Sequence, residues 1–351
     1  MNLPASQDTL MFREAGQAAD VVAEQFARNQ AVVRALAADL RATPPPFVAT
    51  CARGSSDHAA TYGKYLFETQ LGTVTASVSP SVSSVYGVRQ RLQGALYLAI
   101  SQSGRSPDLL RSVEDARAAG ARVVAMVNDE ASPLAALGDA VLPLCAGPER
   151  SVAATKSYLA TLAALLQLAA HWSRDAALLA SLDALPDALR SAWSVDWSPL
   201  LDGLAGADHP AVRNLFVLGR GLGLGVAQEA ALKFKETCGL HAEAFSSAEV
   251  RHGPMALVGP DFPLLCFTQP DATEAGTLAL ADEFRRRGAR VWVASQRDDL
   301  ADALPLPAAP HPACAPLLGV QAFYRAVEAL ARHRGHNPDV PPHLNKVTET
   351  L

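Results

Sequence analysis

Residues 95–113, ALYLAISQSGRSPDLLRSV, decide the fold class that the sequence predicts. Residues 95–100 form a short apolar run that is typical of a buried strand. Six small or polar residues, SQSGRS at 101–106, come next, and Pro107 stands where a helix is expected to begin. A strand that leads through a polar loop into a helix indicates an α/β fold with a parallel sheet.

The loop at 101–106 also predicts an anion site. Ser101, Gln102, Ser103 and Ser106 carry hydrogen-bonding groups, and Gly104 lets the backbone approach a ligand closely. The following helix directs its free N–H groups and the positive end of its dipole toward the same place. Phosphate is the usual anion at such a site. A serine-rich helix cap without a ligand is the alternative, and this stretch alone does not separate the two.

Length and composition restrict the class of protein. The 351 residues predict about two domains. A net charge of -5 argues against nucleic acid or an anionic membrane as the main partner. The longest apolar stretch, 158–170, is too short to span a bilayer and predicts a buried helix. The five cysteines lack metal-binding spacing and no signal peptide is evident, so we expect reduced thiols, no metal and a cytoplasmic protein.

The second half of the chain repeats the first. A Phe-Val pair followed by an Arg-Gly pair and then by a glutamate occurs at 47–68 and again at 216–236. The sequence GARV occurs at 120–123 and again at 288–291. Strands that alternate with helices, twice over, predict two parallel-sheet units that bind ligands beyond the carboxyl ends of their strands. The expected divisions are a helical lead-in at 1–45, domains at 46–185 and 205–335, and a tail at 336–351.

The two copies differ where a ligand would bind. SQSGRS in the first copy becomes TQPDAT at 268–273, which places the carboxylate of Asp271 where a phosphate would lie. We therefore expect one phosphate site per chain, in the first half. The glycine-rich GRGLGLG at 219–225 does not match GxGxxG, so it is only a weak signal for a dinucleotide.

A helix expected at 224–238 is the second candidate centre. Glu229, Lys233 and Glu236 have the spacing that places them on one helix face. They form either a solvated Glu-Lys stripe or a functional face. His252, before a Gly-Pro pair, is expected in a loop, and a carboxylate with a loop histidine suits proton transfer next to a carbonyl.

The proline-broken tail carries one lysine near its end. Lys346 can form a Schiff base with a sugar carbonyl if it enters a dry site. A disordered tail is the alternative.

These motifs together resemble the sugar isomerase (SIS) family. SQSG-x-S, VAATK, EAALKFKE, HAEAF-x5-RHGP and NPDVPPHLNKVTETL match in order across about residues 14–351. The resemblance is greatest to the isomerase half of glucosamine-6-phosphate synthase and to stand-alone glucosamine-6-phosphate deaminases. It implies two tandem SIS domains, each a parallel sheet flanked by helices in a flavodoxin-like three-layer sandwich.

The resemblance also implies roles for single residues. Glu236 would move a proton between C1 and C2, and Lys233 would be a site lysine on the same helix. His252 would assist ring opening and would come from the partner subunit of a homodimer, and Lys346 would hold the open-chain sugar. Contacts to the sugar phosphate are implied for Gly54, Ser55, Ser56, Ser101, Gln102, Ser103, Ser106, Val152 and Ala153.

Some positions depart from the family pattern. Arg53 and Arg105 replace a small and an acidic residue, and Ala154 stands where the synthase has a serine. The two arginines either reach substrate anions or face solvent. The chain starts at Met1, its first cysteine is Cys51, and we therefore expect no glutaminase domain.

The implied reaction converts glucosamine 6-phosphate and water into fructose 6-phosphate and ammonia. A base and an acid suffice for such a shift, so no cofactor is expected. Alternatives are a deglycase or isomerase of another phosphosugar amine, such as fructoselysine 6-phosphate or galactosamine 6-phosphate, and ammonia-dependent synthesis as the reverse reaction. A sugar-phosphate sensor is disfavoured, because residues 1–45 are too short and insufficiently basic for a DNA-binding domain.

Overall fold

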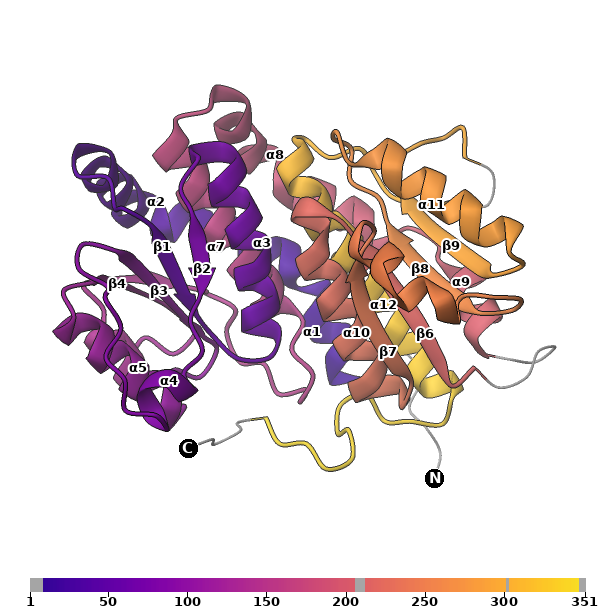
Figure 1. Cartoon of the computed structure of the whole chain (residues 1–351), viewed down its shortest axis with the longest axis horizontal. Helices are drawn as coiled ribbons and strands as arrows, with labels where there is room; N and C mark the ends of the chain where they lie inside the picture. Colours follow the sequence, from indigo (N-terminus) through magenta and orange to yellow (C-terminus); the bar gives the residue numbers. More distant parts are fainter. Residues whose placement is uncertain (1–8, 206–211, 301–302, 347–351) are drawn as a thin grey trace. The chain divides into compact units, whose positions relative to one another are not determined.

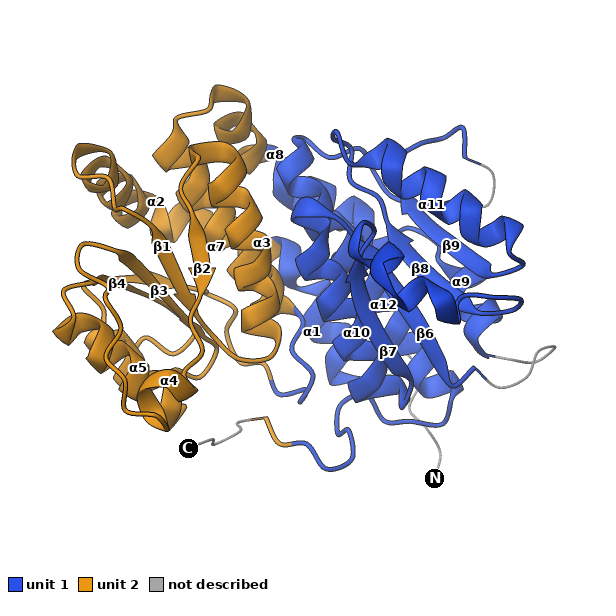
Figure 2. Cartoon of the chain, viewed as in Figure 1, with its two compact units in different colours: residues 1–19, 150–155, 184–344 blue, residues 20–149, 156–183, 345–351 orange. Residues whose placement is uncertain are grey.

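The computed structural model describes residues 9–205, 212–300 and 303–346, which fall into two compact units (Figure 2). Unit 1 comprises residues 1–19, 150–155 and 184–344, and unit 2 comprises residues 20–149, 156–183 and 345–351. Each unit therefore combines segments that are distant in sequence. The domain limits expected from the sequence stay predictions, and their outermost residues, 1–8 and 347–351, lie outside the described chain.

Unit 2 is built from alternating strands and helices. Its strands are β1 (Val48–Cys51), β2 (Thr75–Ser77), β3 (Leu96–Ser101), β4 (Arg122–Val127) and β5 (Ala140–Pro143). Its helices are α2 (Ala18–Ala42), which begins in unit 1, α3 (Ser55–Leu71), α4 (Ser81–Ser84), α5 (Pro107–Ala118), α6 (Pro133–Leu137) and α7 (Lys156–Ser173).

All strand pairs in the unit 2 sheet are parallel, in the order β2-β1-β3-β4-β5. Cys51 of β1 lies opposite Ala99 of β3, and Ser101 lies opposite Val127 of β4. The carboxyl ends of these strands therefore meet at one edge of the sheet. Strand order reverses between β1 and β3, which is the point where open parallel sheets bind ligands.

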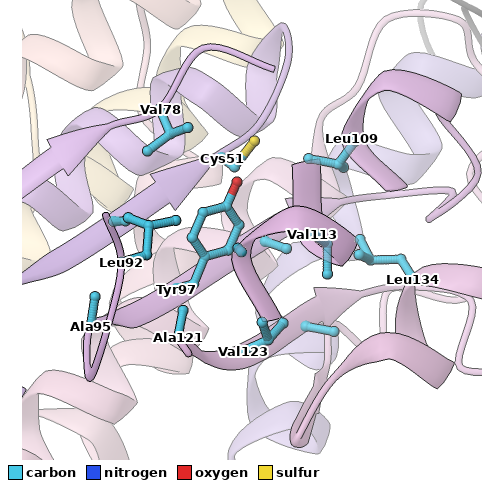
Figure 3. Packing of buried hydrophobic residues seen from close by; sticks show 14 of the residues in the cluster. Cys51, Val78, Leu92, Ala95, Tyr97, Leu109, Val113, Ala121, Val123 and Leu134 are labelled. Carbon is cyan, nitrogen blue, oxygen red and sulfur yellow. The ribbon is translucent and has the colours of Figure 1, made fainter. Parts of the chain in front are cut away.

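Helices cover both faces of this sheet (Figure 1), so its central strands β3 and β4 are buried along almost their whole length. Figure 3 shows the face that α5 covers, where Tyr97 of β3 packs near Cys51, Val113 and Val123. On the other face lie α3 and α7, which also contact each other. The long apolar stretch at 158–170 lies within α7 and is buried almost all round, as the sequence predicted.

Unit 1 has the same construction. Its strands are β6 (Asn214–Gly219), β7 (His241–Ser246), β8 (Pro263–Phe267), β9 (Arg290–Ser295) and β10 (Ala303–Pro305). Its helices are α1 (Leu10–Gly16), α8 (Ala176–Trp193), which begins in unit 2, α9 (Ser198–Ala205), α10 (Leu224–Cys238), α11 (Glu274–Arg286) and α12 (Ala315–His333). Short 3-10 turns are η2 (Gly221–Gly223), η3 (Glu249–His252), η4 (Pro254–Leu257) and η5 (Pro312–Cys314).

The parallel sheet of unit 1 has the order β10-β9-β8-β6-β7, which matches unit 2 strand for strand when β6 is equated with β1. Buried side chains of α11 pack on Phe216, Leu218 and Cys266 at one face, and α10 contacts β6, β7 and α12. Two parallel sheets flanked by helices confirm the expected fold class and the internal duplication. Among the described residues, no helix has the length and apolarity that a membrane span requires.

One glycine controls the shape of the loop at 101–106. Gly104 has a φ of +64°, and its carbonyl accepts a hydrogen bond from the backbone N–H of Leu134. A Cβ at this position would lie 2.3 Å from Oγ of Ser132. That hydroxyl accepts the backbone N–H of Ala135 and caps α6, so it cannot move aside without losing the cap. Both conformation and space therefore require glycine here.

We predict that Gly104→Ala lowers the free energy of unfolding by about 1–3 kcal/mol more than Gly147→Ala does, because the added methyl group overpacks the loop. Gly147 is the matched control, since its φ is +62° and nothing lies within 4 Å of an added Cβ. Urea denaturation of both variants measures the difference. Equal losses would show that the contact with Ser132 does not constrain the loop.

Candidate active site

The expected phosphate loop lies at the carboxyl edge of the unit 2 sheet. Ser101 is the last residue of β3, and its Oγ accepts a hydrogen bond from the backbone N–H of Gly104 at 3.0 Å. Helix α5 begins at Pro107, as predicted, with Ser106 as its extended N-cap residue. Gln102, Ser103 and Ser106 are half-buried. The buried hydroxyl of Ser101 thus shapes the loop, while the other side chains stay accessible beside a helix N-terminus.

A second loop lies at the same edge of this sheet. Gly54, with a φ of +55°, precedes α3, and Ser55 and Ser56 form the first turn of that helix. Strand β1, which leads into this loop, pairs with β3, which leads into the phosphate loop. Unit 2 therefore brings the serines after β1 and the serines after β3 together at the topological switch point.

Arg53 and Arg105, which depart from the family pattern, both donate hydrogen bonds to carboxylates in unit 2. Arg53 donates to Oδ2 of Asp108 from Nε at 3.0 Å and from its terminal nitrogen at 2.6 Å. Arg105 donates to Oδ2 of Asp129 at 2.8 Å. The hydrogen bond from Arg105 lowers the pKa of the Asp129 carboxyl. The sequence places Asp108 in the first turn of this helix, as the structure does, but its pairing with Arg53 was not predicted.

One carboxylate and one backbone carbonyl hold the segment that contains Val152 and Ala153, which lies in unit 1. Glu14 accepts the backbone N–H groups of Arg150 at 2.6 Å and Ser151 at 3.1 Å. The backbone carbonyl of Asp339 accepts the N–H of Val152 at 3.1 Å.

The side chain of Asp339 accepts the N–H groups of Leu10 and Met11 at the start of α1, each at 2.7 Å. The sequence analysis missed both Glu14 and Asp339, because their partners are backbone groups that no sequence pattern identifies. The backbone of residues 150–152 is thereby held within unit 1.

Lys346 pairs with a buried carboxylate within unit 2. Its Nζ lies 2.9 Å from Oε2 of Glu149, whose side chain is fully buried. Glu149 also accepts the N–H and the hydroxyl of Ser157 at the start of α7. A buried carboxylate is costly unless it is paired and hydrogen-bonded, so this contact stabilises the end of the tail. The sequence analysis missed Glu149, although it stands in GPER directly ahead of the VAATK motif.

Three charged side chains of α10 in unit 1, Glu229, Lys233 and Glu236, form a largely buried row of ion pairs. Glu229 and Lys233 are both 0% exposed, so the alternative of a solvated Glu-Lys stripe is wrong. Nζ of Lys233 donates to Oε2 of Glu236 at 2.6 Å and lies 3.3 Å from Oε1 of Glu229. Tyr324 of α12 donates its hydroxyl to the same oxygen of Glu229 at 3.2 Å. The sequence analysis placed Glu229 on this helix face without giving it a role, and it missed Tyr324.

The two carboxylates determine the charge of Lys233. Burial by itself lowers the pKa of this amine, but the negative charges of Glu229 and Glu236 outweigh that effect and raise the pKa above its ordinary value. Lys233 is therefore a fixed ammonium rather than a nucleophile. Glu236, whose side chain is 19% exposed, is the member of this row that a ligand can reach.

His252 is the last residue of η3 and is exposed within the single chain. Gly253 follows with a φ of +143°, a conformation that favours glycine. The described residues provide no hydrogen-bond partner for the imidazole. Its contribution to a partner subunit stays a prediction.

We predict that Lys233→Met lowers the free energy of unfolding by about 3–5 kcal/mol, because it leaves the carboxylate of Glu229 buried without its counter-charge. Lys235→Met is the control, since Lys235 is exposed on the same helix. Urea denaturation at neutral pH measures both.

The stability that the charge of Lys233 contributes changes with pH in a defined direction. Because the pKa of Lys233 is raised in the folded chain, its contribution is complete below the ordinary value of 10.5 and declines as pH rises above it. A Lys233→Met variant as stable as Lys235→Met would contradict the buried pairing.

Comparison with known proteins identifies the family. The SIS domain model matches residues 48–171 and 211–331, which is more than half of the chain. The glutamine–fructose-6-phosphate aminotransferase (isomerizing) of Symbiobacterium thermophilum is 35% identical over 309 residues, which is 84% of this chain and 48% of that protein. A Thermus thermophilus enzyme of the same name is 33% identical over 328 residues, with shares of 89% and 53%. The chain thus spans about half the length of these relatives.

Solved structures agree with this assignment. A proposed phosphosugar isomerase from Silicibacter pomeroyi DSS-3 is 44% identical, with a TM-score of 0.87 and coverage of 94% of this chain and 100% of that one. A glucosamine-6-phosphate deaminase from Thermotoga maritima is 21% identical, with a TM-score of 0.76 and coverage of 97% and 100%, and shows likeness in fold alone. Two matched repeats, these relatives and the two parallel sheets lead to one conclusion: the chain belongs to the SIS family of sugar isomerases.

Proposed function

We propose that this SIS protein converts glucosamine 6-phosphate and water into fructose 6-phosphate and ammonia. The observation that carries the proposal is the contact of 2.6 Å between the ammonium of Lys233 and the carboxylate of Glu236. The buried ammonium holds that carboxylate in a fixed position, and an aldose-ketose shift needs a positioned base. Family membership supports the coarser assignment to the sugar isomerases.

Phosphate recognition is assigned to unit 2. The loops at 54–56 and 101–106 supply serine hydroxyls and the N-termini of α3 and α5 at one sheet edge. A phosphate dianion accepts hydrogen bonds from both kinds of donor, and the helix dipoles favour its charge. Val152 and Ala153 are assigned to the sugar, because the contacts of Glu14 and Asp339 hold their backbone in place.

Glu236 performs the proton transfer in this mechanism. The opened sugar has an aldehyde at C1 and an amine at C2, and Glu236 takes the proton from C2 and returns it to C1. O1 gains a proton and the amine nitrogen loses one in the same shift, so the product has a hydroxymethyl group at C1 and an imine at C2. Water adds to the imine, and ammonia leaves to give the ketone. Lys233 stays protonated throughout and holds the carboxylate in position.

Two further residues are assigned from the family pattern. The imidazole of His252 assists ring opening in a homodimer, where it acts on the substrate of the partner subunit. The exposure of His252 in the single chain supports this assignment. Lys346 holds the open-chain sugar, and Glu149 keeps its amine in a defined place before the sugar arrives.

We predict that Glu236→Gln lowers ammonia release by about 10²–10⁴-fold, the range that a general base contributes. Binding of glucosamine 6-phosphate should persist, because the amide has nearly the same size. Glu243→Gln is the control, since Glu243 is exposed on the neighbouring strand β7. A coupled ammonia assay and calorimetric titration measure the two quantities.

Turnover by Glu236→Gln at the wild-type rate would remove Glu236 from the mechanism. The same assay across galactosamine 6-phosphate and fructoselysine 6-phosphate, read as ammonia or amine release, decides which amine is the substrate. A protein that binds sugar phosphates and releases no amine from any of them would be a sensor, and the proposal would fail.

A further inference from the structure

The ion pair between Arg53 and Asp108 in unit 2 has no role in the mechanism above. Asp108 lies in the first turn of α5, and its side chain is 0% exposed, whereas that of Arg53 is 51% exposed. Two nitrogens of the guanidinium reach the same carboxylate oxygen, Oδ2, at 2.6 and 3.0 Å. The other oxygen accepts the backbone N–H of Leu109 at 2.8 Å. Such contacts fix both partners at the start of α5.

This position makes the charge of Asp108 a problem for phosphate binding. The carboxylate lies two residues beyond Ser106, at the helix N-terminus that the phosphate is assigned to use. It occupies the N–H of Leu109, and its negative charge would repel a dianion nearby. A buried carboxylate also interacts strongly with its neighbours, because little water screens it. A phosphate site can work here only if that charge is compensated.

The second copy of the fold supplies an internal comparison. Arg220 and Gly221 follow β6 as Arg53 and Gly54 follow β1, so the arginine is present in both copies. The residue at the Asp108 position of the second copy is Ala275, in the first turn of α11. There, the carboxylate of Asp271 accepts the N–H and the hydroxyl of Thr273. The buried Asp-Arg pair therefore occurs in the copy to which we assign the phosphate.

We propose that Arg53 neutralises Asp108 and so determines the affinity of the α5 site for a phosphate dianion. Asp108 in turn fixes the guanidinium between the loop after β1 and the loop after β3. Arg53 is thus a positioning and specificity residue for phosphorylated sugars. The proposal rests on the assignment of the phosphate to this loop in the proposed function.

A double-mutant cycle tests this pair. Calorimetric titration of the full chain with inorganic phosphate and with glucosamine 6-phosphate compares Arg53→Met, Asp108→Asn and the double variant. Arg53→Met should weaken binding of both ligands by about tenfold or more, because an uncompensated like charge within several ångströms strongly disfavours a bound anion. Asp108→Asn should bind at least as tightly as wild type, and the double variant should return to within about threefold of wild type.

Two further variants keep the result interpretable. Arg111→Met removes an exposed arginine whose guanidinium lies 3.3 Å from Asp115 on the same helix, so it should leave phosphate binding nearly unchanged. Arg53→Lys keeps the charge and should retain most of the affinity. Thermal melts confirm that each variant is folded, and if Arg53→Met is not, the double variant and Arg53→Lys decide the question.

Three results would overturn the inference: Arg53→Met binding like wild type, a double variant as weak as Arg53→Met, or Arg53→Lys as weak as Arg53→Met. The second of these would make Arg53 a direct ligand without a compensating role. Failure of the phosphate assignment has a different signature, because the wild-type chain would then bind neither phosphate ligand. Failure of the proposed reaction alone leaves binding intact and is read as the absence of ammonia release. Glucosamine without phosphate is the reference ligand, and its binding should not respond to Arg53.

Discussion

The ammonium of Lys233 is the charge on which the proposed chemistry depends. A lysine that is 0% exposed would normally lose its proton, yet two carboxylates on the same helix raise its pKa. Glu229 is equally buried and accepts a hydrogen bond from Tyr324, so the inner end of the row of ion pairs is structural. Glu236 is the outer member of the row, and its carboxylate accepts the hydrogen bond of Lys233 and is partly accessible. Loss of Lys233 or of Glu229 would leave a buried charge on α10 uncompensated, at a cost in stability.

The duplicated sheet explains how one chain acquired two different centres. Both units place loops beyond the carboxyl ends of parallel strands, where such sheets bind ligands. In unit 2, serines and Gly104 keep that place available for an anion. In unit 1, the carboxylate of Asp271 takes up the N–H of Thr273 instead. Unit 1 carries the ion pairs of Lys233 with Glu229 and Glu236 on α10, so the proposed function assigns phosphate recognition to one copy of the fold and proton transfer to the other.

Local patterns predicted the elements well, and pairings between distant residues could not be predicted. Helix α5 begins at Pro107 and α10 spans Leu224–Cys238, as expected, because caps and apolar spacing are local signals. Spacing alone could not decide whether Lys233 was solvated, since burial depends on α12. The partners of Arg53 and Lys346 are 55 and 197 residues away, and only the folded chain selects them. Roles for His252 and the dimer remain predictions, because they need a second subunit.

The most direct test follows the hydrogen at C2 of the substrate. Glucosamine 6-phosphate deuterated at C2 is incubated with the wild-type chain, and the products are analysed by NMR and mass spectrometry. If Glu236 moves a proton from C2 to C1, the product is fructose 6-phosphate, with deuterium at C1 or lost to solvent, and ammonia appears in equal amount. An aldose phosphate that retains deuterium at C2, or ammonia without any ketose, would contradict the account.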